Sequence, residues 1–281
     1  MIIRSVHARE ILDSRGTPTV EAEIVLSGGE KGTAAVPSGA SVGKYEAHEL
    51  RDGDASRYFG KGVMKAVENV KNEIASALIS RSFESQKELD STLIELDGTK
   101  NKSRLGANAL LAVSLAAARA AALFKALPLY EYLAFSGTLL LPVPMMNVIN
   151  GGEHASNNID IQEFMIMPLG FENFRNALRA SAEVYMALKK VAKNRSLSTA
   201  VGDEGGFAPQ LPKDKDALDL LMEAIQAAGY APRKDFCIAI DAAASGWHQG
   251  GGNYKLPKSG ISYSREELIT YWQSLIDEYP I

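Results

Sequence analysis

The first part of the chain alternates between hydrophobic and polar residues in short stretches. Three of these, residues 2–6, 19–26 and 32–36, predict strands, because the side chains of a strand point alternately to its two faces. Residues 13–18 and 27–29 lie between them and are rich in glycine, serine and aspartate, which is typical of turns. The pattern predicts a small antiparallel meander.

Hydrophobic residues at helical spacing follow. Apolar side chains recur every three or four positions over residues 63–78, which predicts an amphipathic helix. Residues 105–124 are apolar on most faces, so we expect this second helix to lie inside the domain rather than in a membrane. Strands followed by helices predict an α+β domain over residues 1–135.

A different pattern begins near residue 140. Three apolar runs without polar alternation, typical of strands buried on both faces, occupy residues 143–149, 164–167 and 236–240. Helical patterns occupy residues 171–193, 216–228 and 264–278. The alternation predicts a parallel α/β unit over residues 140–281, and a TIM-like β/α barrel is one way to close it. Only three barrel-type strands are visible where such a barrel needs eight, so we expect it to be incomplete.

Local signals mark the ends of these predicted elements. Ser264 and Glu267 form a Ser-x-x-Glu capping box at the start of the last helix. Gly229 fits the left-handed position after the middle helix. Residues 135–138 are predicted to link the two domains.

Composition narrows the class of protein. With 46% hydrophobic and 23% charged residues, the chain resembles an ordinary globular protein. A formal net charge of −4 and the lack of a Lys/Arg cluster argue against nucleic-acid binding. One cysteine, Cys237, cannot form an internal disulfide, and the first residues lack a signal-peptide pattern. We therefore expect a cytoplasmic protein without a membrane span.

Polar residues gather next to the predicted buried strands. The segments in question are Asn150-Gly151-Gly152-Glu153-His154, Gln162-Glu163, Gly202-Asp203-Glu204-Gly205-Gly206 and Asp241. In an α/β barrel the active site lies at the carboxyl ends of the strands, which suits Asp241 and the His154 loop.

Each of these residues also has a purely structural interpretation. Asp241 could be the N-cap of a following helix, and residues 202–206 could be no more than a tight turn. A single histidine such as His154 is more often a surface or hydrogen-bonded residue. Glu163 is the most informative, because a carboxylate beside an apolar strand is costly to bury without a partner.

Taken together, seven segments resemble the enolase family in order and spacing over the whole chain. They cover residues 13–21, 37–41, 105–109, 147–155, 162–165, 202–206 and Asp241. Residues 153–158, which read Glu-His-Ala-Ser-Asn-Asn, resemble the bacterial branch.

The resemblance implies a fold and a reaction. It implies an N-terminal α+β lid domain and a C-terminal β/α barrel that opens with two strands and two helices. It also implies a glycolytic lyase that reversibly dehydrates 2-phosphoglycerate to phosphoenolpyruvate through an enediolate, with Mg²⁺ as cofactor. The enolase superfamily is itself the standard example of this chemistry. A cytoplasmic homodimer or octamer is implied, and a second location at the cell surface is left open.

The resemblance also implies roles for individual residues. Glu204 would be the general acid that protonates the leaving hydroxyl, with Glu163 close by. His154 would contact the substrate from a mobile loop, and Gln162 would line the same pocket.

Two further residues would hold metal. Asp241 would be a carboxylate ligand of the tighter Mg²⁺ ion, and Ser41, on the lid loop, would ligate the second once substrate closes the site. Oxygen ligands of this kind suit Mg²⁺.

One departure from the family affects activity. The family's base lysine, two further Mg²⁺ carboxylates and phosphate-binding arginine correspond to positions after residue 281. We therefore expect the isolated chain to be inactive, whether it is a truncation, a proteolytic fragment or half of a split enzyme. The alternative is a non-catalytic binding or structural module derived from an enolase, although a mere scaffold need not keep Ser41, Glu163, Glu204 and Asp241.

Overall fold

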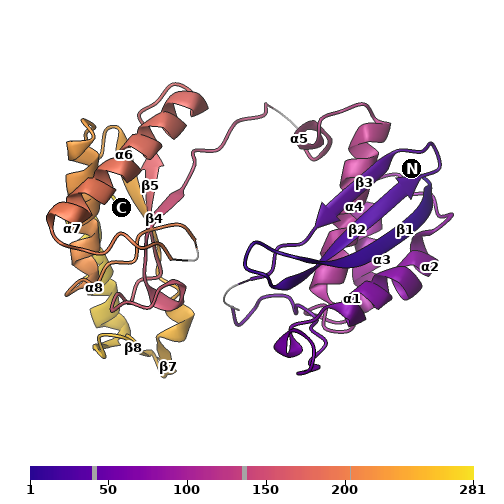
Figure 1. The fold of residues 1–281 in the computed structure, drawn as a ribbon, viewed down its shortest axis with the longest axis horizontal. Helices are drawn as coiled ribbons and strands as arrows, with labels where there is room; N and C mark the ends of the chain where they lie inside the picture. Colours follow the sequence, from indigo (N-terminus) through magenta and orange to yellow (C-terminus); the bar gives the residue numbers. More distant parts are fainter. Residues whose placement is uncertain (40–42, 135–137, 203) are drawn as a thin grey trace. The chain divides into compact units, whose positions relative to one another are not determined.

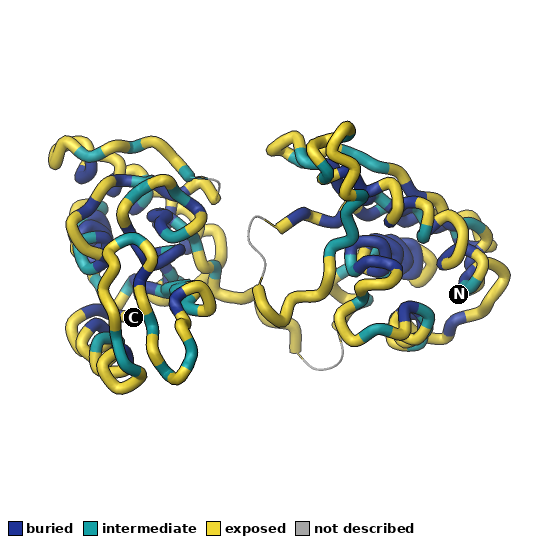
Figure 2. The backbone as a smooth tube through the Cα atoms, turned by 90° about the horizontal axis from the view of Figure 1, so that it is seen from below, coloured by how far each residue is buried: buried dark blue, intermediate teal, exposed yellow. Residues whose placement is uncertain are grey.

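The computed structural model describes residues 1–39, 43–134, 138–202 and 204–281. The chain divides into two compact units, Met1–Leu139 and Leu140–Ile281 (Figure 1). In each unit the buried segments lie inside and the exposed loops surround them (Figure 2). The predicted linker falls largely on residues 135–137, outside the described part of the chain.

The first unit contains the predicted meander. Strands β1 (Ile3–Leu12), β2 (Pro18–Leu26) and β3 (Lys31–Ala35) pair antiparallel in the order β1-β2-β3. Strand β1 runs well beyond the predicted end at residue 6. Its continuation is rich in polar residues, but Ala8 still faces the core, so the alternation continues in weaker form.

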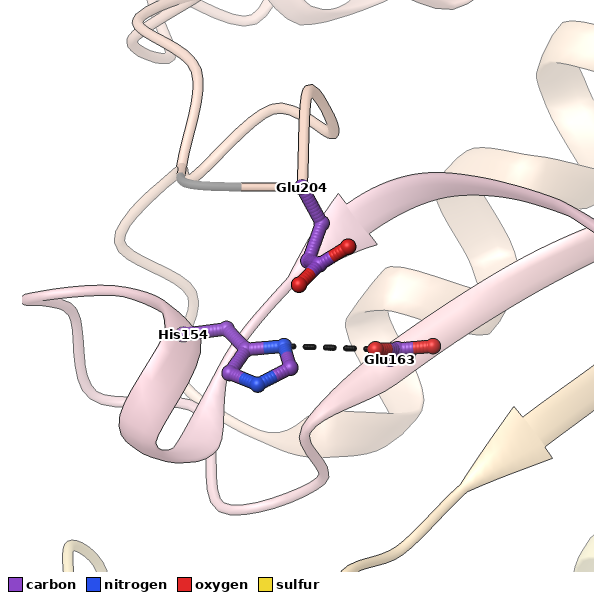
Figure 3. A group of neighbouring side chains, drawn as sticks. All are labelled: His154, Glu163 and Glu204. Carbon is purple, nitrogen blue, oxygen red and sulfur yellow. Dashed lines mark ion pairs between the residues drawn. The ribbon is translucent and has the colours of Figure 1, made fainter. Parts of the chain in front are cut away.

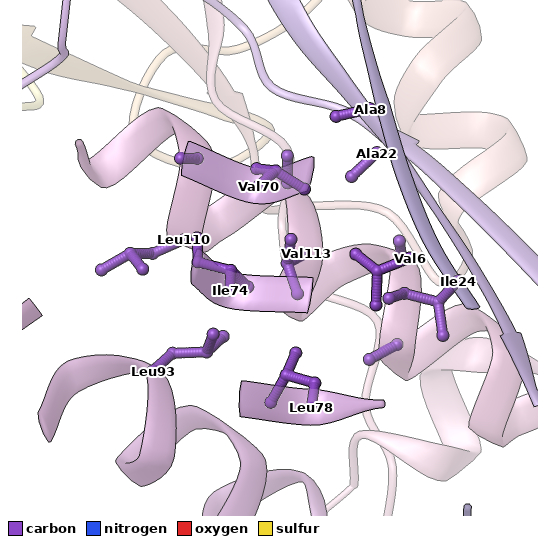
Figure 4. Packing of buried hydrophobic residues seen from close by; sticks show 14 of the residues in the cluster. Val6, Ala8, Ala22, Ile24, Val70, Ile74, Leu78, Leu93, Leu110 and Val113 are labelled. Carbon is purple, nitrogen blue, oxygen red and sulfur yellow. The ribbon is translucent and has the colours of Figure 1, made fainter. Parts of the chain in front are cut away.

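Helices cover this sheet and enclose the first core. Helix α1 (Met64–Asn69), a π-helical stretch η2 (Val70–Ile74) and helix α2 (Ala75–Leu78) follow one another without a break, which confirms the predicted helix over residues 63–78. Figure 4 shows their apolar side chains packed between the strands and the neighbouring helices.

Helix α4 (Ala107–Phe124) is the predicted apolar helix. Within the described residues it alone is long and apolar enough to cross a membrane, but 61% of it is buried inside the unit. It packs against β2 and β3. At the closest approach, a Cβ on Gly32 of β3 would stand 2.1 Å from the carbonyl oxygen of Ala116, so only glycine fits there.

Three helical segments of the first unit were not predicted: η1 (Tyr58–Gly60), α3 (Gln86–Asp97) and α5 (Leu129–Tyr132). In α3 only Leu89 and Leu93 are buried hydrophobic residues, so its apolar periodicity is weak. Its start is nevertheless well capped, because the side chain of Ser85 accepts the Glu88 N–H at 3.2 Å.

The second unit is built on the sheet β4-β5-β6. Its strands β4 (Met146–Asn150), β5 (Glu163–Pro168) and β6 (Phe236–Asp241) lie at the three predicted positions. Strand β5 is antiparallel to both neighbours, so the predicted parallel arrangement is wrong.

The connections explain the antiparallel pairing. Only a loop with one 3₁₀ turn, η3 (Gly152–His154), joins β4 to β5, whereas a parallel pair needs a longer crossover, usually a helix. Two helices, α6 (Phe174–Asn194) and α7 (Asp214–Ala227), join β5 to β6. One helix carries the chain back along the sheet and the second carries it forward again, so β6 runs opposite to β5.

The prediction that these strands are buried on both faces is wrong for β5 and β6, whereas the last three residues of β4 are all buried. Residues of β5 alternate between buried and half-buried, and Phe164 and Ile166 are fully buried on one face. That face packs into the second core with residues of α6 and α7. The opposite face, with Met165 and Met167, is partly accessible.

A small third sheet and the last helix follow. Strands β7 (His248–Gly250), β8 (Asn253–Lys255) and β9 (Ser262–Ser264) precede α8 (Arg265–Glu278). The capping box at Ser264 and Glu267 is confirmed, with both hydrogen bonds present. Gly229 has φ +87° just after α7, as predicted for a left-handed helix end.

Candidate active site

One edge of the sheet β4-β5-β6 collects the polar residues that the sequence singled out. Asn150 is the last residue of β4, Glu163 the first of β5 and Asp241 the last of β6. Asn150 pairs with Glu163, and Glu163 pairs with Asp241. Because β5 is antiparallel to both neighbours, its start meets their ends, and directly paired residues point to the same face of a sheet.

The Asp241 carboxylate is held by two donors. Gln162 donates from Nε2 to Oδ2 at 3.2 Å, and the Ala243 N–H donates to Oδ1 at 3.0 Å. The 3₁₀ turn that follows, η4 (Ala244–Gly246), has Ala243 as its N-cap, so Asp241 is not a helix cap. Gln162 is buried, and its backbone N–H also donates to the Asp241 carbonyl at 3.1 Å.

His154 is buried rather than a surface histidine. It lies in η3, in the loop after β4, and its Nδ1 is 3.2 Å from Oε1 of Glu163 (Figure 3). The contact has the distance of an ion pair but not the geometry of a hydrogen bond.

The acidic turn brings Glu204 to the same place. Ligand atoms of His154, Glu163 and Glu204 all lie within 4.8 Å of one another (Figure 3). The turn is closed by hydrogen bonds from Gly202 N–H to Gly206 O, at 2.8 Å, and from Gly205 N–H to Gly202 O, at 3.1 Å. The interpretation as a tight turn is therefore correct, and the turn also carries a carboxylate into the cluster. Asp203 lies outside the described residues.

Glycine allows this turn to pack closely against β4. A Cβ on Gly206 would stand 2.1 Å from Oδ1 of Asn150, and one on Gly202 would stand 2.9 Å from its Nδ2. Directly after the turn, Phe207 exchanges backbone hydrogen bonds with β4, donating to Val148 O and accepting from Asn150 N–H, both at 2.9 Å. The position of Glu204 thus depends on the absence of side chains at two neighbouring residues.

The electrostatics of the cluster centre on Glu163. Burial raises the pKa of its carboxyl, the carboxylates of Asp241 and Glu204 raise it further, and His154 opposes them. Neighbouring carboxylates cannot all be ionised without cost, so one of them tends to keep its proton. For Glu163 the shift favours the protonated form relative to an ordinary glutamate.

The donor atoms at this edge fit a hard cation in part. Carboxylate oxygens of Glu163 and Asp241 lie on neighbouring strands, and the donors to Asp241 orient its carboxylate as partners of metal ligands commonly do. The histidine nitrogen is a poorer ligand for Mg²⁺ than oxygen is. Among the described residues, the group with metal-ligand spacing is His154, Glu163 and Glu204, and the predicted ligand Asp241 lies beside it.

For two residues, the sequence and the structure do not give the same information about the site. Ser41, the other predicted metal ligand, lies outside the described residues. The sequence marks Asn150 only as part of a polar segment, yet it is fully buried, and among the residues that the structure describes neither atom of its side-chain amide has a hydrogen-bond partner. An asparagine ending an apolar strand, just before two glycines, was the available signal.

Two family models match the chain. The family model described as "Enolase, N-terminal domain" matches residues 3–133. The model described as "Enolase, C-terminal TIM barrel domain" matches residues 138–281. The chain belongs to the enolase family.

The enolase match identifies both units. Residues 3–133 form the N-terminal α+β domain, and β4, β5, α6, α7 and β6 are the opening strands and helices of the C-terminal barrel. The order of two strands and two helices agrees with the opening that the resemblance implied. In the described part of the chain these strands form an open sheet rather than a closed barrel.

Proposed function

We propose that this chain carries part of the active site of an Mg²⁺-dependent hydro-lyase that reversibly dehydrates 2-phosphoglycerate to phosphoenolpyruvate. The observation that carries the proposal is the convergence of His154, Glu163, Glu204 and Asp241 at one sheet edge. Enolase domain models match almost the entire chain in which this convergence occurs. Residues 153–158 support a bacterial-type member of the family.

The carboxyl groups would provide the proton that the leaving hydroxyl needs. Expulsion of hydroxide needs an acid that keeps its proton near neutral pH. Glu204 would be this acid, and Glu163, whose pKa is raised mainly by burial, lies close by. His154 would contact the substrate across from Glu163, and Gln162 would line the pocket while it orients Asp241.

Asp241 and Ser41 would hold Mg²⁺ through oxygen atoms, and Glu163 lies beside Asp241. Bound there, Mg²⁺ would stabilise the negative charge that develops on the substrate carboxylate as the enediolate forms. The protein's own residues would bind the substrate, orient it and provide the acid.

These 281 residues by themselves would not turn over substrate. The family resemblance assigns the proton acceptor to a lysine outside them, and loss of a general base typically lowers the rate by about 10²–10⁴-fold. The remaining metal ligands and the phosphate-binding arginine are assigned outside them as well.

The test measures formation of the enol product by its ultraviolet absorbance, with Mg²⁺ and after chelation. Two samples are compared: the protein purified from the cells that produce it, and the 281-residue chain alone. The proposal predicts Mg²⁺-dependent product from the first and none from the second. No product from the first would favour a non-catalytic module. Turnover of roughly 1–10³ per second by the chain alone would refute the assignment of the base.

A further inference from the structure

Lys258 connects two distant parts of the second unit. It lies in the turn between β8 and β9 and is half-buried. Its ammonium group donates to the carbonyl of Ala155 at 2.8 Å and to Oδ1 of Asn157 at 3.2 Å. Ala155 follows His154 directly, so this lysine binds the backbone beside the histidine that is predicted to contact the substrate.

The same turn holds the far end of the His154 loop. The backbone N–H groups of Lys258 and Ser259 donate to the two carboxylate oxygens of Asp160, at 2.7 and 3.0 Å. Asp160 is buried, and its own N–H donates to the carboxylate of Asp214 at 2.8 Å. Residues 155–160 are therefore fixed at both ends by one turn that lies about a hundred positions later in the chain.

Asn157 extends the connection to both sides of the candidate site. Its Nδ2 donates to the carbonyl of Asn150, at the end of β4, and to that of Pro209, at 2.9 and 3.0 Å. Because Lys258 occupies the oxygen of this amide, the nitrogen must face the two carbonyls. The lysine thereby helps to hold the amide that joins the end of β4 to the segment after the acidic turn.

Charge supports this arrangement. Lys258 faces the buried carboxyl groups of Asp160 and Asp214, which favour its charged form, while its own partial burial lowers its pKa. A hydrogen bond from an ammonium group to a carbonyl is stronger than one between neutral groups. Replacing the lysine would leave the Ala155 carbonyl without this donor, and the Asn157 oxygen would keep only the longer hydrogen bond from the Ile159 N–H, at 3.4 Å.

We propose that Lys258 is a positioning residue, which holds the loop after β4 so that the His154 ring faces Glu163. Its importance for catalysis rests on the proposed function, but the positioning itself does not. NMR signals and hydrogen exchange measure structure rather than turnover. A failed dehydration assay would therefore not contradict the positioning role of Lys258, and a failed test of that role would not contradict the proposed dehydration.

The experiment compares three variants of the 281-residue chain. Lys258→Met keeps the aliphatic stem and removes the donor, and Lys258→Arg restores a cation that can donate to two acceptors. Lys255→Met is the matched control, because Lys255 is an exposed lysine of the adjacent strand β8. Far-ultraviolet circular dichroism first establishes that each variant is folded.

Two measurements then follow the loop. The chain has four histidines, so the ring signals of His7, His48 and His248 serve as internal references for His154 in NMR spectra. We expect Lys258→Met to shift and broaden the His154 signals alone. We also expect amide hydrogen exchange in residues 155–160 to become about tenfold faster or more, with recovery in Lys258→Arg and no change in Lys255→Met.

Unchanged His154 signals and unchanged exchange in a folded Lys258→Met variant would overturn the proposal, and so would equal changes at all four histidines. Should Lys258→Met not fold, Asn157→Leu takes its place. It removes the amide partner of the lysine and leaves Asp160 intact. His154 signals identical to those of the unmodified chain in that variant would equally overturn the proposal.

Discussion

Replacement of Asp214 by asparagine should change how the stability of the second unit depends on pH. Asp214 begins α7 and is buried, and its Oδ1 accepts the N–H of Asp160. Burial is the main cause that raises the pKa of this carboxyl from its ordinary value of 3.8 to about 6, and the neighbouring Asp160 carboxylate adds to it.

The size and sign of the effect follow from proton linkage. Between pH 3.8 and about 6 the folded chain keeps a proton that the unfolded chain releases. The free energy of unfolding therefore falls as pH rises through this window and levels off above it. The gap between the two pKa values corresponds to about 3 kcal/mol. Asparagine does not ionise, so relative to the unmodified chain the variant should gain about 3 kcal/mol across the window.

Tryptophan fluorescence during urea unfolding is the assay. The chain has two tryptophans, Trp247 and Trp272, and they stack on each other in the second unit, with centroids 6.3 Å apart. Their signal reports on the unit that contains Asp214. The loss of one carboxylate oxygen as an acceptor changes stability equally at every pH. The free energy of unfolding of the variant is therefore compared with that of the unmodified chain at each pH, and only the ionisation of Asp214 makes this difference vary across the window.

Asp277→Asn is the matched control, since Asp277 is an exposed aspartate of the same unit. Its difference from the unmodified chain should vary little over the same range. A difference between Asp214→Asn and the unmodified chain that stays constant from about pH 4 to about pH 8 would refute the reasoning. It would show that Asp214 titrates alike in the folded and unfolded chain.

Two further predictions concern the acidic turn. Gly206→Ala should destabilise the second unit by roughly 2 kcal/mol, because the added Cβ would collide with Asn150. Gly246→Ala is the control, since a Cβ there meets open space and should cost less. Thermal unfolding followed by tryptophan fluorescence compares the two variants. In the protein purified from the cells that produce it, Glu204→Gln should slow dehydration while exchange of the substrate C2 proton with deuterated water persists. Glu153→Gln is the control, because it removes an exposed carboxylate and should change neither rate. Loss of exchange and dehydration together would argue against Glu204 as the acid for the leaving group.

The sequence predicted the fold best where hydrophobic periodicity is strong. The meander and the buried α4 follow from alternation and from a nearly continuous apolar surface. Helix α3 was missed because it buries few hydrophobic residues, and its cap alone was too weak a signal. The parallel sheet was wrongly predicted because apolar runs indicate burial, whereas strand direction depends on the connections.

The candidate site was predictable as a set of residues but not as an arrangement. Strand ends and turns indicated Glu163, Glu204 and Asp241 individually. That Glu163 pairs directly with Asp241 depends on the register and direction of β5, which no local pattern encodes. The role of Lys258 was invisible for the same reason, since its partners lie about a hundred residues earlier in the chain.

Two carboxyl groups with raised pKa values in one unit show why such a shift alone does not identify a catalytic residue. Asp214 is enclosed, and its carboxylate accepts a backbone hydrogen bond from Asp160, so its proton has a structural consequence. Glu163 begins the central strand of its sheet, beside a histidine and two other carboxylates. Groups that share a proton and have access to a ligand can exchange it with a substrate. The difference between the two is therefore geometric: the proposed function rests on the surroundings of Glu163, whereas the proton of Asp214 affects stability.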